Sequence, residues 1–149
     1  MIGCIIPLLM MGWAIPVSVD WHHSDLTPST MISAQSCSTG PAAYAKATMT
    51  GAYMLGGQWG FGVERAGFEF SVKPQLGLSY VDHAVRTLPA RSQYHVGVEI
   101  NVCYERYCSG VSYSHLSNGN AMGLCWSGAE CRPNIGEDMI AFSAGVRWR

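Results

Sequence analysis

The sequence predicts an all-β protein, a small antiparallel barrel of the transmembrane type with about eight strands. Three observations lead to this prediction. Apolar and polar residues alternate strictly along several segments, these segments are long, and glycine and aromatic residues are frequent. Only 13% of the residues are charged, against roughly 25% in an ordinary soluble domain. This combination is typical of a barrel with an apolar outer face and a small, polar lumen.

The first 43 residues show little alternation, and we expect them to precede the barrel. Residues 1–19 are almost wholly apolar, but Pro7 and Pro16 interrupt them and they are short for a transmembrane helix. They fit the apolar region of an export signal better, although no Lys or Arg precedes them. Residues 20–43 are polar and rich in Ser and Thr, so we expect a loop or a poorly ordered segment.

Residues 44–149 form the predicted barrel domain. Alternation is clearest from Phe68 to Tyr80 and from Tyr94 to Tyr104, where one face is apolar and the other small or polar. A barrel of this type closes with at least eight strands, so two more would have to come from the N-terminal third. Six strands are recognisable, at roughly 44–55, 57–65, 67–81, 92–104, 109–117 and 138–148.

A soluble sandwich is the alternative fold, because it would bury the same apolar face against a second sheet. We favour the barrel for two reasons. Aromatic residues recur at the strand ends, and the strands reach the length of about 9–11 residues that a tilted membrane crossing needs.

Six cysteines favour an oxidising compartment. Cys103 and Cys108 bracket one short segment and Cys125 and Cys131 bracket another, so each pair could close a local disulfide. Their spacings, C-x4-C and C-x5-C, do not match the C-x2-C spacing usual for zinc. We therefore predict disulfides and no metal.

The residues that carry chemistry are His115-Leu116-Ser117-Asn118 and, further along, Pro133-Asn134-Ile135-Gly136-Glu137-Asp138. Alternate residues of a strand share a face, so His115 and Ser117 would lie side by side. The antiparallel return strand could bring an acid beside the histidine. A base, a hydroxyl nucleophile and a carboxylate are the groups of a Ser-His-acid hydrolase.

Strand parity distinguishes the two adjacent acids. Extending the alternation puts His115, Ser117 and Asp138 on the apolar face, and Glu137 on the lumen face. We therefore predict Asp138 as the acid. Glu137 is the second candidate, because parity can change at the start of a strand. Polar groups on a lipid-facing surface are costly, which favours a functional role for the three.

Each of these groups has a defined task in ester hydrolysis. His115 would take the proton of Ser117 as the hydroxyl attacks the carbonyl carbon, and the carboxylate would hold the imidazole tautomer. Negative charge then develops on the carbonyl oxygen and needs hydrogen-bond donors. Asn118 and the backbone amides of Gly119 and Asn120 follow the nucleophile directly and are the candidate donors.

At these residues the chain resembles the lipid A 3-O-deacylases of Gram-negative outer membranes (PagL-type). In that family an H-x-S-N motif lies on one strand of an eight-stranded barrel, and a P-N-x-G-x-acid segment opens the next. The resemblance covers the chain from about Tyr94 onward. It implies that His115 is the base, Ser117 the nucleophile and Asp138 the acid, with Asn118 and its neighbours at the oxyanion site.

Three departures from the family pattern stand out. Well-known members carry glutamate where this chain has Asp138, so the acid here is shorter by one methylene group. In addition, Asn120 stands where a glycine is common, and the loop that carries Cys125 and Cys131 is longer.

We therefore expect an exported outer-membrane enzyme that cleaves a fatty-acyl ester of a lipid, lipid A first among the candidates, without metal, nucleotide or other cofactor. Its partners would be the membrane and its lipids, and a homodimer stays open. A formal net charge of −1 and the lack of any basic run argue against nucleic acid. The alternatives are a non-enzymatic barrel with a structural or surface-interaction role and a soluble, secreted lipid-binding domain.

Overall fold

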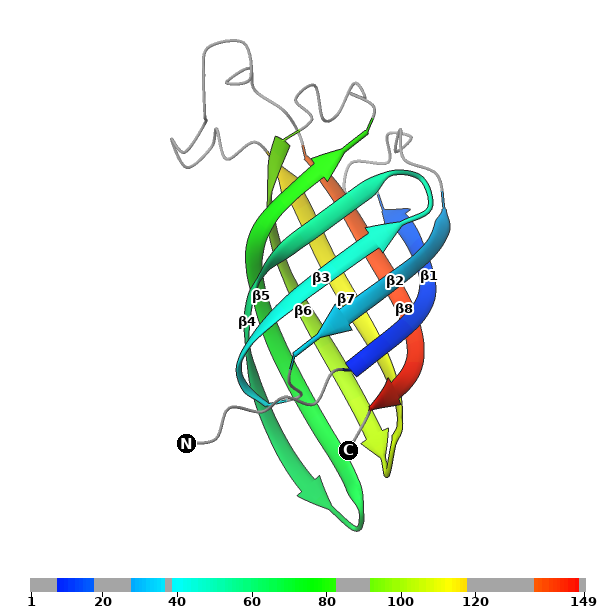
Figure 1. Ribbon diagram of the computed structural model, residues 1–149, viewed down its shortest axis with the longest axis vertical. Coiled ribbons are helices and arrows are strands. Elements are labelled where there is room, and N and C mark those ends of the chain that lie inside the picture. The colour runs from blue at the N-terminus through cyan, green and yellow to red at the C-terminus, as the bar shows by residue number, and fades with distance from the viewer. Residues whose placement is uncertain (1–7, 18–27, 37–38, 83–91, 118–135, 148–149) are drawn as a thin grey trace.

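The chain folds into a closed, eight-stranded antiparallel barrel (Figure 1). The computed structural model describes residues 8–17, 28–36, 39–82, 92–117 and 136–147. Each strand pairs with the next in sequence, and β1 closes the barrel by pairing with β8. No helix in these described ranges could span a membrane. The strands are β1 (Leu8–Val17), β2 (Ser29–Gln35), β3 (Gly40–Thr48), β4 (Ala52–Arg65), β5 (Phe68–Val81), β6 (Ser92–Tyr104), β7 (Tyr107–Ser117) and β8 (Glu137–Arg147).

The predicted all-β barrel is confirmed, and its two missing strands come from the N-terminal third. Residues 20–43 were expected to be a loop, but they contain β2 and the start of β3, so that expectation is wrong for these strands. Residues 1–19 were interpreted as an export signal, whereas β1 lies within them. An export signal that is removed conflicts with this strand, because β1 is hydrogen-bonded to both β2 and β8 as part of the wall.

β1 shows no alternation of polar and apolar residues, because both of its faces carry apolar residues. Leu8 and Met10 point inward and pack with Cys103 and Cys108 at one end of the lumen. On the outward face Trp13 is exposed. A strand with apolar residues on both faces has a nearly continuous hydrophobic sequence, which is also the pattern of an export signal.

A turn divides the predicted strand 44–55. β3 ends at Thr48 and β4 begins at Ala52, and the backbone amide of Ala52 donates to Oγ1 of Thr48 at 3.0 Å. Gly51 in the turn has a φ of 87°, which is accessible to glycine at little cost. The sequence Met49-Thr50-Gly51 contains no Pro or Asn to mark this turn. The predicted strand 57–65 is the second part of β4, which begins five residues earlier at Ala52, and the remaining four predicted strands agree closely with β5 to β8.

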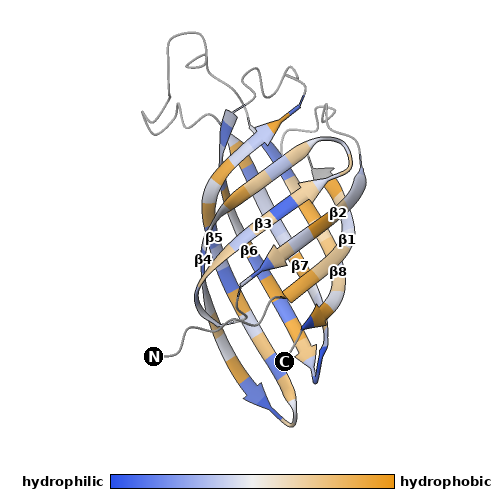
Figure 2. Cartoon of the chain, in the orientation of Figure 1, coloured by the Kyte–Doolittle hydropathy of each residue, from blue (hydrophilic) through white to orange (hydrophobic). Residues whose placement is uncertain are grey.

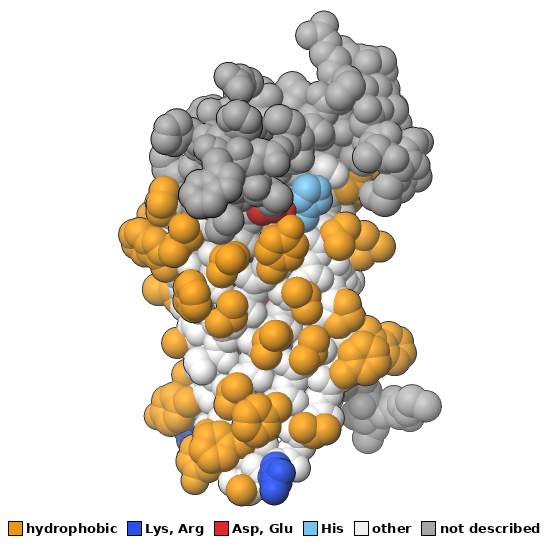
Figure 3. Space-filling view, turned by 180° about the vertical axis from the view of Figure 1, so that it is seen from behind, with side chains coloured by type: hydrophobic (Ala, Val, Ile, Leu, Met, Phe, Trp, Pro, Cys, Tyr) orange, Lys and Arg blue, Asp and Glu red, His pale blue; other side chains and the backbone are white. Residues whose placement is uncertain are grey.

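The side chains of the barrel are arranged inside out relative to those of a soluble protein. Along the strands, hydrophilic and hydrophobic residues alternate (Figure 2), and large apolar side chains cover the outer wall (Figure 3). A sandwich is excluded because the sheet closes on itself and this apolar face points outward. Inward-pointing polar residues that are buried include Ser33, Gln35, Lys46, Gln58, Ser71, Lys73, Gln75, Glu99, Asn101, Ser112 and Ser114.

Charged and amide side chains fill the middle of the lumen around Glu99. Its carboxylate lies 3.3 Å from Nζ of Lys46 and 4.0 Å from Nζ of Lys73. Nδ2 of Asn101 donates to it at 2.7 Å, and Nε2 of Gln75 donates at 3.3 Å. Buried charges require such partners, and the network crosses the lumen between β3, β5 and β6.

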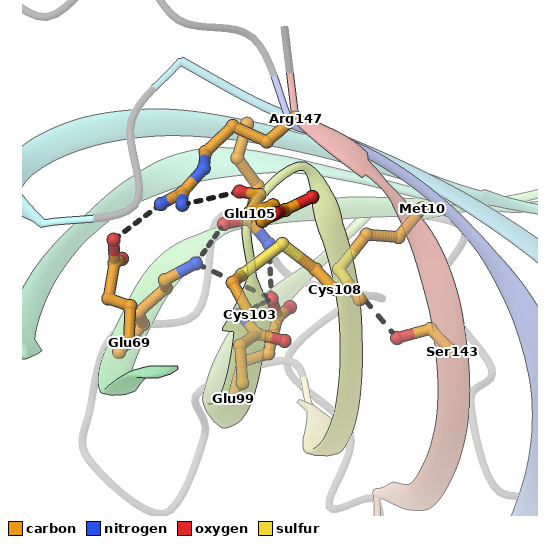
Figure 4. The surroundings of a disulfide bond; sticks show 11 residues. Met10, Glu69, Glu99, Cys103, Glu105, Cys108, Ser143 and Arg147 are labelled. Carbon is orange, nitrogen blue, oxygen red and sulfur yellow. Dashed lines mark hydrogen bonds and ion pairs between the residues drawn. A yellow bond between two sulfur atoms is a disulfide. The ribbon is translucent and has the colours of Figure 1, made fainter. Parts of the chain in front are cut away.

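A disulfide and an ion pair tie together the end of the barrel where the β6–β7 turn lies (Figure 4). The predicted Cys103–Cys108 disulfide is confirmed and joins directly opposite residues of β6 and β7. Arg147 of β8 reaches Glu69 of β5 and also donates to the carbonyl oxygen of Glu105 at 2.9 Å. The predicted Cys125–Cys131 pair lies outside the described residues.

Candidate active site

Pairing between β7 and β8 positions the candidate catalytic side chains. Along β7 the exposed Val111 and Tyr113 alternate with the buried Ser112 and Ser114, so His115 and Ser117 continue the outward row. In β8, Asp138 lies directly opposite His115. The site is therefore at the end of the barrel opposite the disulfide, where β7 leads into residues 118–135.

His115 and Asp138 are in direct contact. Nδ1 of the imidazole lies 2.7 Å from Oδ1 of the carboxylate. The imidazole side chain is 36% exposed and the carboxylate side chain 8% exposed, so the acid is covered while the base remains accessible from outside. Figure 3 shows a histidine beside an acidic group at the edge of the apolar wall. A carboxylate at Nδ1 leaves Nε2 as the nitrogen that can accept a proton from a nucleophile.

Ser117 lies on the same outward face as His115, two positions further along β7. It is half-buried and stands opposite Tyr94 of β6. The intervening Leu116 points inward and is fully buried, which confirms the alternation through this part of the strand. The structure thus brings the predicted base and acid together and places the predicted nucleophile on their face of the wall.

Glu137 lies on the other side of the wall. It stands opposite Leu116, is 3% exposed and belongs to the inward row of β8. The parity prediction is therefore confirmed for both acids, since Asp138 meets His115 on the outer face and Glu137 does not. The strand begins without a bulge that would exchange the two residues, because the β7–β8 register runs unbroken from Tyr107 to Leu116.

Gly136, to which the sequence motif assigned no role, makes room for the imidazole. A Cβ atom there would lie 2.7 Å from Cε1 of His115 and 2.7 Å from the carbonyl oxygen of Leu116. Its φ of 78° also favours glycine. Tyr113 was likewise missed, although it shares the outward face with His115 and alternation could have found it. Its hydroxyl donates to Oδ1 of Asp138 at 2.6 Å.

The predicted oxyanion donors Asn118, Gly119 and Asn120 lie outside the described residues. The other histidine within the described part of the chain, His95, is buried in the lumen and contacts the hydroxyl of Tyr44. Over the same residues, no three His, Cys, Asp or Glu side chains are grouped so that they could hold a metal ion. The outward His115–Asp138 pair is therefore set apart from the polar interior.

An apolar groove of about 690 Å³ crosses the outer wall from β2 to β6. Its volume lies within the range of about 300–1,000 Å³ common for small-molecule sites. Strand register arranges its outward residues in two rows, Ala34–Ala45–Leu55–Leu78 and Ile32–Ala47–Tyr53–Tyr80. The same register continues the first row to Tyr94 and from there to Ser117. The lining of the groove ends at Ser92 and Gln93 of β6, and Tyr94 and Ser117 extend the first row beyond it.

Fold and site together define a class of protein, a small β-barrel with an apolar outer wall and a histidine–aspartate pair on that wall. Comparison of the chain with protein-family models, with curated proteins and with solved structures finds no match.

Proposed function

We propose that the protein is an outer-membrane acyl hydrolase that removes an ester-linked acyl chain from a membrane lipid, with lipid A as the first candidate substrate. The observation that carries the proposal is the His115–Asp138 contact on the apolar outer wall, with Ser117 on the same face. Charged and polar side chains are costly on a surface in contact with lipid and are retained there chiefly for function.

The distribution of exposed side chains supports a membrane location. Apolar residues cover the wall between the β7–β8 site and the turns at the other end. Those turns carry exposed charges, among them Glu64 and Arg65 beside the β4–β5 turn, and Glu105 and Arg106 in the β6–β7 turn. An apolar band bounded by polar ends is the pattern of a transmembrane barrel.

The proposed reaction proceeds through an acyl-enzyme. Oγ of Ser117 attacks the ester carbonyl carbon while Nε2 of His115 takes the hydroxyl proton. The C–O bond to the alcohol breaks, and the imidazolium returns the proton to the departing alkoxide oxygen. Water then attacks the acyl-enzyme with His115 again as base, which releases the fatty acid and restores Ser117. Asp138 holds Nδ1–H and stabilises the imidazolium in both steps.

The outer groove supports a substrate with a long apolar chain. It reaches the start of β6 at Ser92 and Gln93, and it lies near the end of β2. β2 and β6 both run away from the end of the barrel that carries the site. Since the groove meets β6 at its start and β2 near its end, it runs obliquely along the wall from that end toward the opposite one. An acyl chain whose ester lay at Ser117 could follow this path. The sequence resemblance to lipid A 3-O-deacylases supports lipid A over other acylated lipids.

The decisive test is ester hydrolysis by the purified full-length protein in detergent. Lipid A and a glycerophospholipid are supplied in separate reactions, and released fatty acid is measured by mass spectrometry. We expect 3-hydroxy fatty acid from lipid A and a loss of about 10³-fold or more in S117A. S109A is the matched control, because Ser109 lies on the same face of β7 at its far end.

Three results bear on the proposal in different ways. Equal release by S117A and wild type would overturn the Ser117 mechanism. Release from the glycerophospholipid alone would keep the hydrolase and replace its substrate. Release from neither lipid would overturn the enzyme and favour the non-enzymatic barrel.

A further inference from the structure

A second donor shares the carboxylate oxygen that contacts His115. The hydroxyl of Tyr113 donates to Oδ1 of Asp138 at 2.6 Å, and Nδ1 of His115 lies 2.7 Å from the same atom. Tyr113 stands directly opposite Ile140, two positions along the ladder from the His115–Asp138 pair and on the same face. From this diagonal position a long side chain can reach a residue of the neighbouring strand. The three side chains thus form one hydrogen-bonded group on the outer wall.

The position of Asp138 explains why a second donor matters. Its side chain is 8% exposed and lies on the apolar face of β8, next to Ile140 and Phe142 in the outward row. A carboxylate in apolar surroundings is destabilised unless donors compensate for the lost water. Two donors that converge on Oδ1 also oppose rotation of the carboxyl group, which a single hydrogen bond would allow.

We propose that Tyr113 is a positioning residue for the hydrolysis, and this inference rests on the function proposed above. Its hydroxyl holds Asp138 so that Oδ1 faces Nδ1 of His115. Nε2 is then kept available for the serine proton. Tyr113 acts through Asp138, and its hydroxyl hydrogen bond is directed at the acid.

An anchoring role is the competing explanation, because exposed tyrosines occur elsewhere on the wall. Tyr53, Tyr80, Tyr104 and Tyr107 are all at least 42% exposed, like many aromatic residues at the edges of membrane barrels. An anchoring tyrosine acts through its ring, whereas a positioning tyrosine acts through its hydroxyl and needs Asp138. The variant Y113F keeps the ring and removes the hydroxyl, so it separates the two roles.

The first measurement is steady-state hydrolysis by the full-length protein in detergent. We expect Y113F to lower kcat about tenfold and to leave KM within about twofold, because the lost hydrogen bond supports the base and not substrate binding. Y107F, at the opposite end of β7, is the matched control and should retain wild-type kcat. In a D138N background, Y113F should cause no further loss, since the group through which it acts is already altered.

The second measurement does not depend on activity. Nitrogen-15 NMR of the His115 imidazole reports which ring nitrogen carries the proton. We expect the Nδ1–H tautomer in the wild type, held by Asp138, and a mixture of both tautomers in Y113F. Y107F should keep the wild-type spectrum.

These readouts separate failure of this inference from failure of the proposed function. A wild type that hydrolyses lipid, with kcat and tautomer unchanged in Y113F, would overturn the role of Tyr113 and leave the enzyme standing. A kcat loss in Y113F that persists undiminished in the D138N background would also overturn it, in favour of anchoring. A wild type without hydrolysis, whose His115 tautomer still depends on Tyr113, would overturn the function while the coupling of the three side chains remained.

Discussion

At the scale of single residues, Asp138 and Glu137 are neighbours in the chain and lie on opposite sides of the wall. The carboxylate of Asp138 meets His115 outside, whereas Glu137 is buried on the inward row opposite Leu116. The period of two along a strand produces this separation. Aspartate, although shorter than the glutamate of the family that the motif resembles, stands directly opposite the histidine and so reaches Nδ1.

The two acids should therefore differ sharply when each is replaced by its amide. We expect D138N to lower kcat for lipid hydrolysis by about 10³- to 10⁴-fold, because an amide in place of the carboxylate favours the wrong imidazole tautomer. E137Q should stay close to wild type in the same assay, since its side chain is directed away from His115. A greater loss in E137Q than in D138N would reverse the assignment of the acid.

At the scale of elements, the seam between β1 and β8 decides whether the barrel closes. Residues of β1 from Leu8 to Val17 pair with β8 from Arg147 back to Asp138. The partner of β1 at its far end is therefore Asp138 itself, so the strand that closes the wall also supports the start of β8. The candidate site depends on a segment whose apolar sequence alone suggests an export signal.

Glycine at the seam offers a test of this arrangement. A Cβ at Gly12 would lie 2.0 Å from the carbonyl oxygen of Phe142 in β8. We expect G12A to lower the free energy of unfolding by about 1–3 kcal/mol through overpacking. Urea unfolding followed by tryptophan fluorescence and the mobility of unheated samples on gels would measure the effect.

Gly57 is the matched control, because it lies in β4 on the outer face and a Cβ there would have no atom within 4 Å. G57A should therefore unfold at the wild-type urea concentration. Equal stability of G12A and wild type would show that β1 is not packed against β8 as described.

At the scale of the whole molecule, charged side chains pair inside the lumen, whereas the outer wall exposes apolar side chains. Glu99 is 2% exposed and is the carboxylate that faces both Lys46 and Lys73. The lumen network lies inside the wall, whereas the candidate site lies outside it. Stability and catalysis should therefore respond to different substitutions.

Removing the charge of Glu99 should destabilise the barrel without acting on the site directly. We expect E99Q to lower the free energy of unfolding by about 3–5 kcal/mol, since two buried lysines lose their counter-charge. Urea unfolding in detergent measures this loss. E64Q, at an exposed position at the end of β4, should change little. A stable E99Q protein would contradict a structural role for the network.

The sequence by itself determined the fold class, four strands nearly to their ends, the Cys103–Cys108 pair and the face on which His115, Ser117 and Asp138 lie. These are properties of local alternation, and a period of two depends only on backbone geometry. Tertiary structure alone decided the origin of β1 and β2, the turn between β3 and β4, and the contact of Tyr113 with Asp138. Two of these depend on residues from other strands: Leu8 and Met10 meet an apolar part of the lumen, and Tyr113 meets an acid on the neighbouring strand. Strand pairing and closure of the sheet set these partners, whereas the pattern along one strand gives only the face on which a residue lies.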